Sequence, residues 1–381
     1  MAKKKSKPKR PSPKRPKPGR ASPKRSKAKR VRLESKIRCA AIGLGMGRHH
    51  AKAFAEDGRT ELVAVCDLDT SRCDRLVHEN DWSGVRCYTD YKRMLKVEKP
   101  AVVSVALPNF LHAPVSVDCL NSGAHVICEK PMAMNTAECG RMIRAARRHD
   151  RQLMINFSYR YMPQSRFLKG LVDEGRLGKV YYARTGWHRR RGIPGLGGWF
   201  TTKKLSGGGP LIDLGVHRID LAWWLMGSPD PVTVSASTYS VFGPRMAKER
   251  GGTFTVEDLA AGIVRFRNGS TLLIEVSWAS NSGERERMFT ELYGDAGGAR
   301  QVNLEEGYKF RTEYFTEMGG SQVNVEQHSA GSFAEGGAKH LISCVAEGTQ
   351  VDSSGEDGLA IQKILDGMYR SAELGREVKI R

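Results

Sequence analysis

Short apolar runs alternate with amphipathic stretches in the first part of the chain. Within the amphipathic stretches, apolar residues recur at the spacing of a helix that buries one face. Short apolar strands that alternate with such helices form parallel sheets covered by helices on both sides. We therefore predict a doubly wound α/β domain over residues 36–157. The expected strands are 37–42, 61–66, 101–107, 125–128 and 152–156, and the expected helices are 48–57, 71–80, 90–96, 111–121 and 136–149.

The pattern changes after Gly178 to longer strands in which apolar and polar residues alternate. Asn268-Gly269, between two of these strands, is typical of a hairpin turn. A helix is expected from Pro210 to Gly227, since proline suits a first helical position and glycine ends helices. We predict an α+β domain over residues 158–381, with a large, mainly antiparallel open-faced sheet. Its bare face is expected to pair with another subunit in a homodimer or homotetramer. The expected strands are 180–188, 232–241, 259–266, 271–278 and 288–293.

Composition separates an appendage from this globular body. Of the 381 residues, 40% are hydrophobic, which is enough to form buried cores. Residues 1–30 contain fifteen Lys or Arg, six Pro and no acidic residue, so they carry +15 of the net charge of +21. We predict a disordered basic tail over residues 1–35. It is either a solvated polycation or a non-specific nucleic-acid tether, because Ser12-Pro13-Lys14-Arg15 and Ser22-Pro23-Lys24-Arg25 resemble histone-tail repeats.

Several classes of protein are disfavoured by the same composition. No apolar run follows the basic stretch, and no stretch approaches the ~18 apolar residues of a membrane span. The eight cysteines include no Cys-x-x-Cys pair, and several lie inside apolar runs. We predict a reduced, cytoplasmic protein that contacts no membrane and holds no metal.

A glycine-rich turn, Gly43-Leu44-Gly45-Met46-Gly47, joins the first strand to a helix that begins at Arg48. Glycines allow the backbone to approach a pyrophosphate, and the first amides of the helix point at its charge. Only Met46 separates the last two glycines, so the turn is one residue shorter than the usual Rossmann motif. Asp67, twenty residues beyond Gly47, is placed to accept ribose hydroxyls. The sequence predicts NAD as the cofactor, and Arg72 leaves NADP open.

Three residues are candidates for catalysis. Lys130, in Glu129-Lys130-Pro131, follows an apolar strand, and Asp213 and His217 lie four residues apart on one helix face. His217 suits the role of proton acceptor, with an ordinary pKa of ~6.5 against ~10.4 for lysine, which leaves Lys130 to stabilise an oxyanion. Asp213 is expected to orient the substrate or the imidazole. The alternative is a capping aspartate beside a partly buried histidine.

These motifs together, with Pro108-Asn109-x-x-His112, Asn156-x-x-x-Arg160-Tyr161 and Gly208-Gly209 in order, resemble the Gfo/Idh/MocA family. That family comprises relatives of glucose-fructose oxidoreductase and inositol dehydrogenase. The resemblance implies reversible oxidation of a hydroxyl on a sugar, cyclitol or related polyol, with a hydride passing to the nicotinamide. It implies catalytic roles for Lys130, Asp213 and His217. The cofactor positions expected from the turn and the resemblance are Gly43, Gly45, Met46, Gly47, Arg48, Asp67, Pro108, Asn109, His112, Glu129 and Lys130.

The segment 187–200 connects a strand to the catalytic helix and is expected to lie over the substrate. Its arginines at 189–191 suit an anionic substrate, the cofactor or a neighbouring subunit. Substrate contacts are expected at Tyr159, Arg160, Arg191, Trp199 and Asp213.

Three functions are compatible with these features. The first is a dehydrogenase of sugars or polyols. The second is a glycosidase that oxidises its sugar, eliminates the leaving group and re-reduces the product with the same NAD. The third is a non-enzymatic redox sensor or a DNA-tethered protein.

Overall fold

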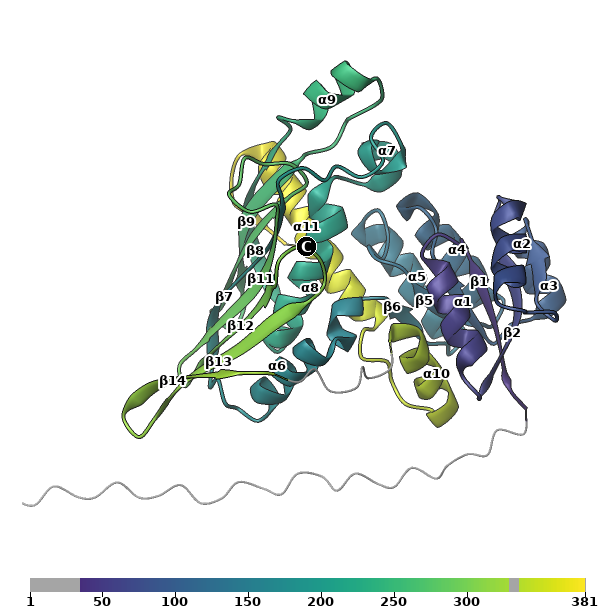
Figure 1. The fold of residues 1–381 in the computed structure, drawn as a ribbon, viewed down its shortest axis with the longest axis horizontal. Helices are drawn as coiled ribbons and strands as arrows, with labels where there is room; N and C mark the ends of the chain where they lie inside the picture. The colour runs from purple at the N-terminus through teal and green to yellow at the C-terminus, as the bar shows by residue number, and fades with distance from the viewer. Residues whose placement is uncertain (1–34, 329–335, 381) are drawn as a thin grey trace, which may run out of the picture. The chain divides into compact units, whose positions relative to one another are not determined.

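The computed structural model describes residues 35–328 and 336–380. The predicted basic tail, apart from Ser35, lies outside the described residues. Two sheets form the described part of the chain (Figure 1). The elements as far as η1 are β1 (Ile37–Ile42), α1 (Gly47–Glu56), β2 (Thr60–Cys66), α2 (Thr70–Glu79), β3 (Arg86–Tyr88), α3 (Tyr91–Glu98), β4 (Val102–Val105), α4 (Asn109–Asn121), β5 (His125–Cys128), α5 (Thr136–Arg148), β6 (Leu153–Ile155) and η1 (Ser158–Tyr161).

The second sheet and its helices follow η1 in the chain. These elements are α6 (Pro163–Asp173), β7 (Val180–Arg189), η2 (Trp199–Thr201), α7 (Lys203–Ser206), η3 (Leu211–Gly215), α8 (Val216–Leu225), β8 (Pro231–Tyr239), α9 (Gly243–Arg250), β9 (Leu259–Phe266), β10 (Thr271–Ser277), β11 (Glu286–Gly294), β12 (Gly298–Asn303), β13 (Phe310–Met318), β14 (Ser321–Glu326), α10 (Gly337–Glu347), α11 (Gly355–Leu374) and β15 (Val378–Lys379).

The first sheet is parallel and has the strand order β3-β2-β1-β4-β5-β6. This is the order of a doubly wound dinucleotide-binding sheet, so the predicted fold class of the first part is confirmed. Its central strands β1, β4 and β5 are mostly apolar because both of their faces are largely buried. The order changes direction between β1 and β4, and it is there that ligands bind in such sheets.

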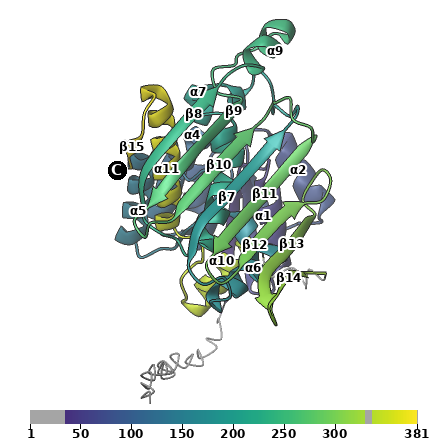
Figure 2. The ribbon, with the colours of Figure 1, turned by 90° about the vertical axis from the view of Figure 1, so that its left-hand side faces the viewer.

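The second sheet has the order β14-β13-β12-β11-β7-β10-β9-β8-β15 and is antiparallel except for the pair β7 and β10 (Figure 2). The predicted open-faced, mainly antiparallel sheet is therefore confirmed. The expected hairpin also forms, since β9 and β10 pair around Gly269, whose φ of 85° favours glycine. Strands β3 and β12 to β14 and helices α6, α9 and α10 were not predicted.

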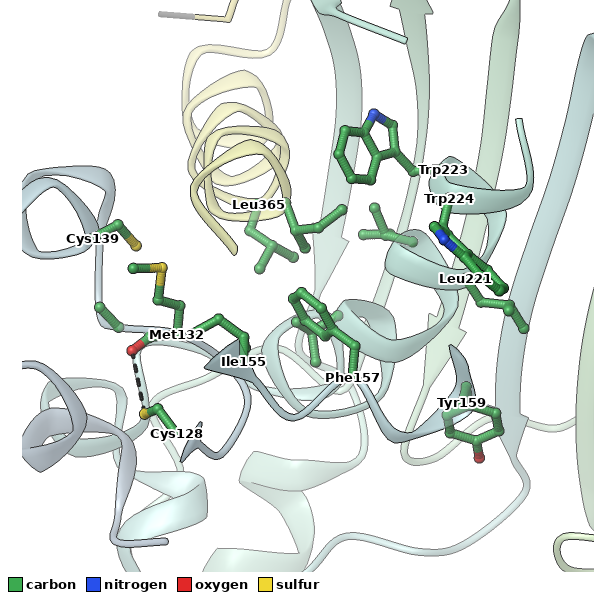
Figure 3. Packing of buried hydrophobic residues seen from close by; sticks show 14 of the residues in the cluster. Cys128, Met132, Cys139, Ile155, Phe157, Tyr159, Leu221, Trp223, Trp224 and Leu365 are labelled. Atoms are coloured by element: carbon green, nitrogen blue, oxygen red, sulfur yellow. Dashed lines mark hydrogen bonds between the residues drawn. The ribbon is translucent and has the colours of Figure 1, made fainter. Parts of the chain in front are cut away.

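One hydrophobic core joins the two sheets. Helices α8 and α11 cover one face of the second sheet, and in the described residues its other face is bare (Figures 1 and 2). Figure 3 shows Leu365 of α11 near Met132 and Ile155 of the parallel part, with Trp223 and Trp224 of α8 in the same cluster. Because these side chains are shared, the ends of β5 and β6 hold a fixed position against α8.

Helix α10 returns to the parallel sheet near the end of the chain. Its Leu341 and Ile342 are fully buried in a second cluster with Phe54 of α1. Residues far beyond position 157 therefore complete the core of the parallel part. The expected boundary between residues 157 and 158 stays a prediction, and both buried clusters contain residues from either side of it.

Candidate active site

The glycine turn between β1 and α1 brings two glycines close to the end of β4. Gly43 has a φ of 83°, and a Cβ there would lie 2.4 Å from the Ala106 carbonyl oxygen. A Cβ on Gly47 would lie 3.2 Å from the Ala106 Cβ, so this glycine allows α1 to pack closely against the end of β4. Asp67 holds the turn, since its Oδ2 accepts a hydrogen bond of 2.7 Å from the Leu44 amide. The shortened motif therefore still builds a strand, a tight turn and a helix.

A cavity of about 680 Å³ runs from this turn to the end of β5, and we call it the cofactor-side cavity. Its position at the carboxyl ends of the parallel strands suits a dinucleotide. Arg72 also lines it and lies 3.9 Å from Asp67. Nine of the expected cofactor residues line the cavity: Gly43, Gly45, Met46, Arg48, Asp67, Pro108, Asn109, Glu129 and Lys130.

Two expected cofactor residues do not line this cavity. Gly47 instead packs against β4, as described above. His112 is buried, with Nδ1 2.7 Å from the Pro131 carbonyl oxygen and Nε2 2.7 Å from that of Leu107. His112 thus joins the ends of β4 and β5 and acts on the cavity through the backbone.

An ion pair joins Lys130, which follows β5 of the parallel sheet, to Asp213 in η3. The Lys130 Nζ donates to Asp213 Oδ1 and to the Asp213 carbonyl oxygen, both at 3.0 Å, and each side chain is 17% exposed. Trp278, just after β10, donates from Nε1 to Asp213 Oδ2 at 3.1 Å. Burial alone raises the pKa of the Asp213 carboxyl, but Lys130, His217 and Trp278 together hold it below its ordinary value. An ionised Asp213 therefore fixes the lysine ammonium beside the cavities.

His217 lies one turn beyond Asp213, where the π-helical turn η3 passes into α8. Its ring is 5.2 Å from the ring of Tyr159 and 6.1 Å from that of Trp187. Nδ1 is buried and has no hydrogen-bond partner within the described residues. Burial, reinforced by the charge of Lys130, holds the pKa of His217 well below its ordinary value.

Asp213 was expected to orient the substrate or the imidazole. Its carboxylate oxygens bond to Lys130 and Trp278, and no hydrogen bond joins it to the imidazole within the described residues. Asp213 thus orients the lysine, while aromatic packing orients His217.

Glu129 anchors a buried polar chain behind Lys130. Its Oε1 accepts from Asn156 Nδ2 at 2.7 Å and lies 3.3 Å from His50 Nε2, and His50 Nδ1 lies 2.6 Å from Ser104 Oγ. Burial alone raises the pKa of Glu129, but the interactions with His50, Asn156 and Lys130 lower it to about 2. The chain fixes the backbone from which Lys130 projects.

A second cavity, of about 1030 Å³, meets the first at Glu129, Lys130 and Asp213, and we call it the substrate-side cavity. Aromatic side chains form much of its wall. They include Tyr159, Trp187, Phe200 and Tyr308. Tyr159 lies at this wall, where a substrate contact was expected.

Three expected substrate residues lie elsewhere. Arg160 is 1% exposed and pairs with Asp220 at 2.6 Å and Asp357 at 2.7 Å, so it is a structural ion-pair centre. Arg191 lines neither cavity; it donates to the Ser280 carbonyl oxygen and its guanidinium lies over the Phe242 ring. Trp199 lines the cofactor-side cavity, stacked on Phe200 at 3.8 Å. None of the three lines the substrate-side cavity.

Two site-building residues were not expected from the sequence. Trp278 carried a weak signal, an aromatic residue at a strand end. Glu257 is buried and its Oε1 accepts from the amides of Gly209 (3.0 Å) and Leu211 (3.1 Å) and from the Tyr369 hydroxyl (2.8 Å). It secures the turn that carries Asp213, and no local pattern marks it.

In the described part of the chain, no group of three or more His, Cys, Asp or Glu side chains is placed to hold a metal ion. Within the same residues, no helix has both the length and the apolarity to cross a membrane.

Comparison with known proteins agrees with this geometry. Residues 37–157 match the family described as "Oxidoreductase family, NAD-binding Rossmann fold", and residues 165–300 match the "GFO/IDH/MocA C-terminal domain". The chain therefore belongs to the Gfo/Idh/MocA family of oxidoreductases. It is a nicotinamide-dependent enzyme that acts on CH–OH groups, and NAD is its cofactor.

Named relatives cover almost the whole chain. D-glucoside 3-dehydrogenase of Escherichia coli is 32% identical over 91% of this chain and 98% of its own length. Myo-inositol 2-dehydrogenase of Thermotoga maritima is 27% identical over 90% of this chain and 98% of its own. Among solved structures, aldose-aldose oxidoreductase from Caulobacter crescentus matches with a TM-score of 0.76 and 25% identity, over 90% of this chain and 99% of its own.

Proposed function

We propose that the protein oxidises a hydroxyl of an uncharged sugar or polyol, with His217 as the proton acceptor and Lys130 as the oxyanion stabiliser. The main observation is the contact of 3.0 Å between Lys130 Nζ and Asp213 Oδ1. It fixes an ammonium group where the cofactor-side and substrate-side cavities meet, one helical turn from His217.

The residues present suit each step of this reaction. NAD, when bound, supplies the acceptor for the hydride that leaves the alcohol carbon. His217 is neutral because its pKa is lowered, and with Nδ1 buried its Nε2 is the atom that takes the hydroxyl proton. Lys130 donates a hydrogen bond to the oxygen as negative charge develops. Asp213 and Trp278 hold that ammonium in place before the substrate arrives.

The charges around the substrate-side cavity favour an uncharged substrate. Of the cations that line it, Lys130 pairs with Asp213, Arg189 pairs with Glu286 at 2.9 Å, and Lys339 lies 3.7 Å from Glu56. A phosphorylated or acidic sugar would need an unpaired cation there. The expected arginine-lined anion site is therefore not part of this proposal. The names of the two relatives specify a glucoside and myo-inositol, which carry no charge.

The test is a substrate screen with purified protein and NAD. Methyl glycosides, free sugars and inositols are incubated with the enzyme, and the absorbance of the reduced nicotinamide is followed. Steady accumulation with at least one compound is expected. Release of an aryl leaving group without net reduction of NAD would instead select the glycosidase. The proposal is wrong if no compound of the panel changes the absorbance of the reduced nicotinamide in either direction of the reaction.

We also propose that the bare face of the second sheet pairs with another copy of the chain. Half-buried apolar residues such as Ile263 and Leu273 alternate there with ion pairs such as Arg300 with Glu313 at 2.6 Å. Light scattering is expected to show a dimer or tetramer, and Leu273→Glu should shift it toward monomer. A monomeric wild type would contradict the proposal.

A further inference from the structure

The substrate-side cavity continues well beyond the catalytic residues. Its catalytic end is formed by Lys130, Asp213 and His217 with the aromatic wall. Its distal end is formed by the last turn of α1 with Asp57 and Gly58, and by residues 336–339 at the start of α10. At about 1030 Å³ the cavity is at the upper limit of the ~300–1,000 Å³ of ordinary ligand sites. A single sugar ring at the catalytic end leaves the distal end unused.

The 3₁₀ segment η1 forms one wall that runs along both ends. Tyr159 is at the catalytic end, 5.2 Å from the ring of His217. Tyr161 lines the same cavity and lies 5.2 Å from the ring of His340 on α10. Tyr161 is fixed there, because its hydroxyl lies 3.0 Å from Ser353 Oγ. The two ends are therefore parts of one site built on a rigid support.

The distal end offers room with little charge. Ala53, Gly58 and Ala338 present only small side chains to the cavity, and a Cβ added to Gly58 would meet nothing within 4 Å. Its charged groups are already engaged, Asp57 by Arg59 at 2.6 Å and Lys339 by Glu56 at 3.7 Å. Polar groups among small side chains suit an uncharged ring with hydroxyls or an aromatic face.

A different set of contacts fixes the aromatic wall at the catalytic end. Tyr308 is 63% exposed, and its ring stands edge-on to Trp187 at 6.2 Å. Glu286 holds its loop, accepting from the Gly307 amide at 3.1 Å and from Trp187 Nε1 at 2.8 Å. The free face of Tyr308 can stack on the apolar C–H face of the reacting ring. Contacts to the reacting ring and contacts at the distal end can thus be tested separately.

We propose that the enzyme acts on two-ring glycosides, with the reacting sugar beside Lys130 and His217 and the second ring between α1 and the start of α10. The second ring is another sugar or an aromatic aglycone, and both have the uncharged, hydroxyl-bearing or flat chemistry that this end accepts. This inference rests on the proposed function, since it assumes that the catalytic end oxidises a sugar hydroxyl.

The test compares two substrates that share the reacting ring. One is a methyl glycoside, and the other is the glycoside of the same sugar with a second ring. The quantity measured is the ratio of their kcat/KM values, two-ring over one-ring. The wild type is expected to favour the two-ring substrate about tenfold or more, because a second ring is buried in the site.

Gly58→Phe fills the distal end and is expected to lower this ratio about tenfold. Gly84→Phe is the matched control, because Gly84 is also exposed and also has no atom within 4 Å of its Cβ position, but lines neither cavity. The control is expected to keep the wild-type ratio. Lys339→Trp fills the same end from the opposite wall, so the test stands even if one variant folds poorly.

Tyr308→Ala tests contacts at the catalytic end of the cavity without changing those at its distal end. It is expected to lower kcat/KM about two- to tenfold for both substrates, with rescue by Tyr308→Phe, and to leave their ratio unchanged.

Two results overturn the inference. They are a wild-type ratio near one and a ratio unchanged in both Gly58→Phe and Lys339→Trp. In each of these cases a sugar is still oxidised and the proposed function stands. Failure of the proposed function has a different signature, because then no sugar of any kind reduces NAD.

Discussion

Replacing Lys130 by methionine tests the central contact of the site. Methionine keeps much of the side-chain length and removes the ammonium, with its two hydrogen bonds of 3.0 Å to Asp213. Removing one preorganised oxyanion donor typically costs about 3–4 kcal/mol of transition-state stabilisation. We therefore expect kcat to fall by about 10²–10³.

The same substitution has a structural effect that must be measured separately. Asp213 loses the charge that lowers its pKa, so its pKa is expected to rise. Because both side chains are 17% exposed, the loss of folding free energy should be about 2 kcal/mol, below the range for fully buried pairs. NAD affinity should change little, since the glycine turn and Asp67 are untouched.

The assay is steady-state reduction of NAD, with calorimetric titration of NAD and urea denaturation on the same preparations. Lys92→Met is the matched control, because Lys92 is an exposed lysine 3.4 Å from Asp118 and lines neither cavity. If Lys130→Met binds NAD and keeps turnover within tenfold of wild type, the lysine does not stabilise the transition state and Glu129-Lys130-Pro131 is a structural turn.

Three further predictions follow from buried charges. The pKa of His217 lies well below 6.5, so the acid limb of the pH profile of kcat/KM should lie below that pH. Arg218→Met removes a fully buried positive charge that helps to lower this pKa, and the variant should therefore move the acid limb to higher pH. An unmoved limb would contradict this. The pKa of Glu129 falls from 4.5 to about 2 on folding, so its contribution to stability is complete above pH 4.5 and is lost as the pH falls toward 2. In Glu129→Gln the midpoint of urea denaturation should therefore depend less on pH over this range. The same pH dependence in the variant and the wild type would count against this reasoning. Glu257→Ala leaves two amides of the turn before α8 without their acceptor, so it should lower the free energy of unfolding, measured in urea, by about 1–3 kcal/mol. Glu257→Gln keeps an acceptor oxygen and should lower this free energy by less. Equal losses in the two variants would contradict the role of these hydrogen bonds.

Local pattern was sufficient for much of the fold and part of the site. The strand, glycine turn and helix at residues 37–56 are specified by neighbouring residues, and so is the position of Asp67 at the end of β2. Lys130 could be located because parallel strands end at the same edge of a sheet. Strands β12 to β14 escaped prediction because their pairing partners, rather than their own periodicity, stabilise them.

The pairing of side chains that are distant in sequence required the tertiary structure. Lys130 and Asp213 are 83 positions apart, and Trp278 reaches the same carboxylate from a third element. Arg160 lies in a promising motif, but its guanidinium is buried between Asp220 and Asp357. Periodicity indicates which face of an element is buried, but it does not indicate which side chain lies opposite.

The sequence by itself therefore determined the two-part architecture and the cofactor turn, because these depend on short-range spacing, and it indicated Lys130, Asp213 and His217 as candidates for catalysis. Only the tertiary structure decided that Asp213 contacts Lys130 rather than His217, and that the start of α10 lines one end of a cavity of about 1030 Å³. The physical reason is that hydrogen bonds and cavity walls are formed by groups brought together through packing, and packing depends on the whole chain.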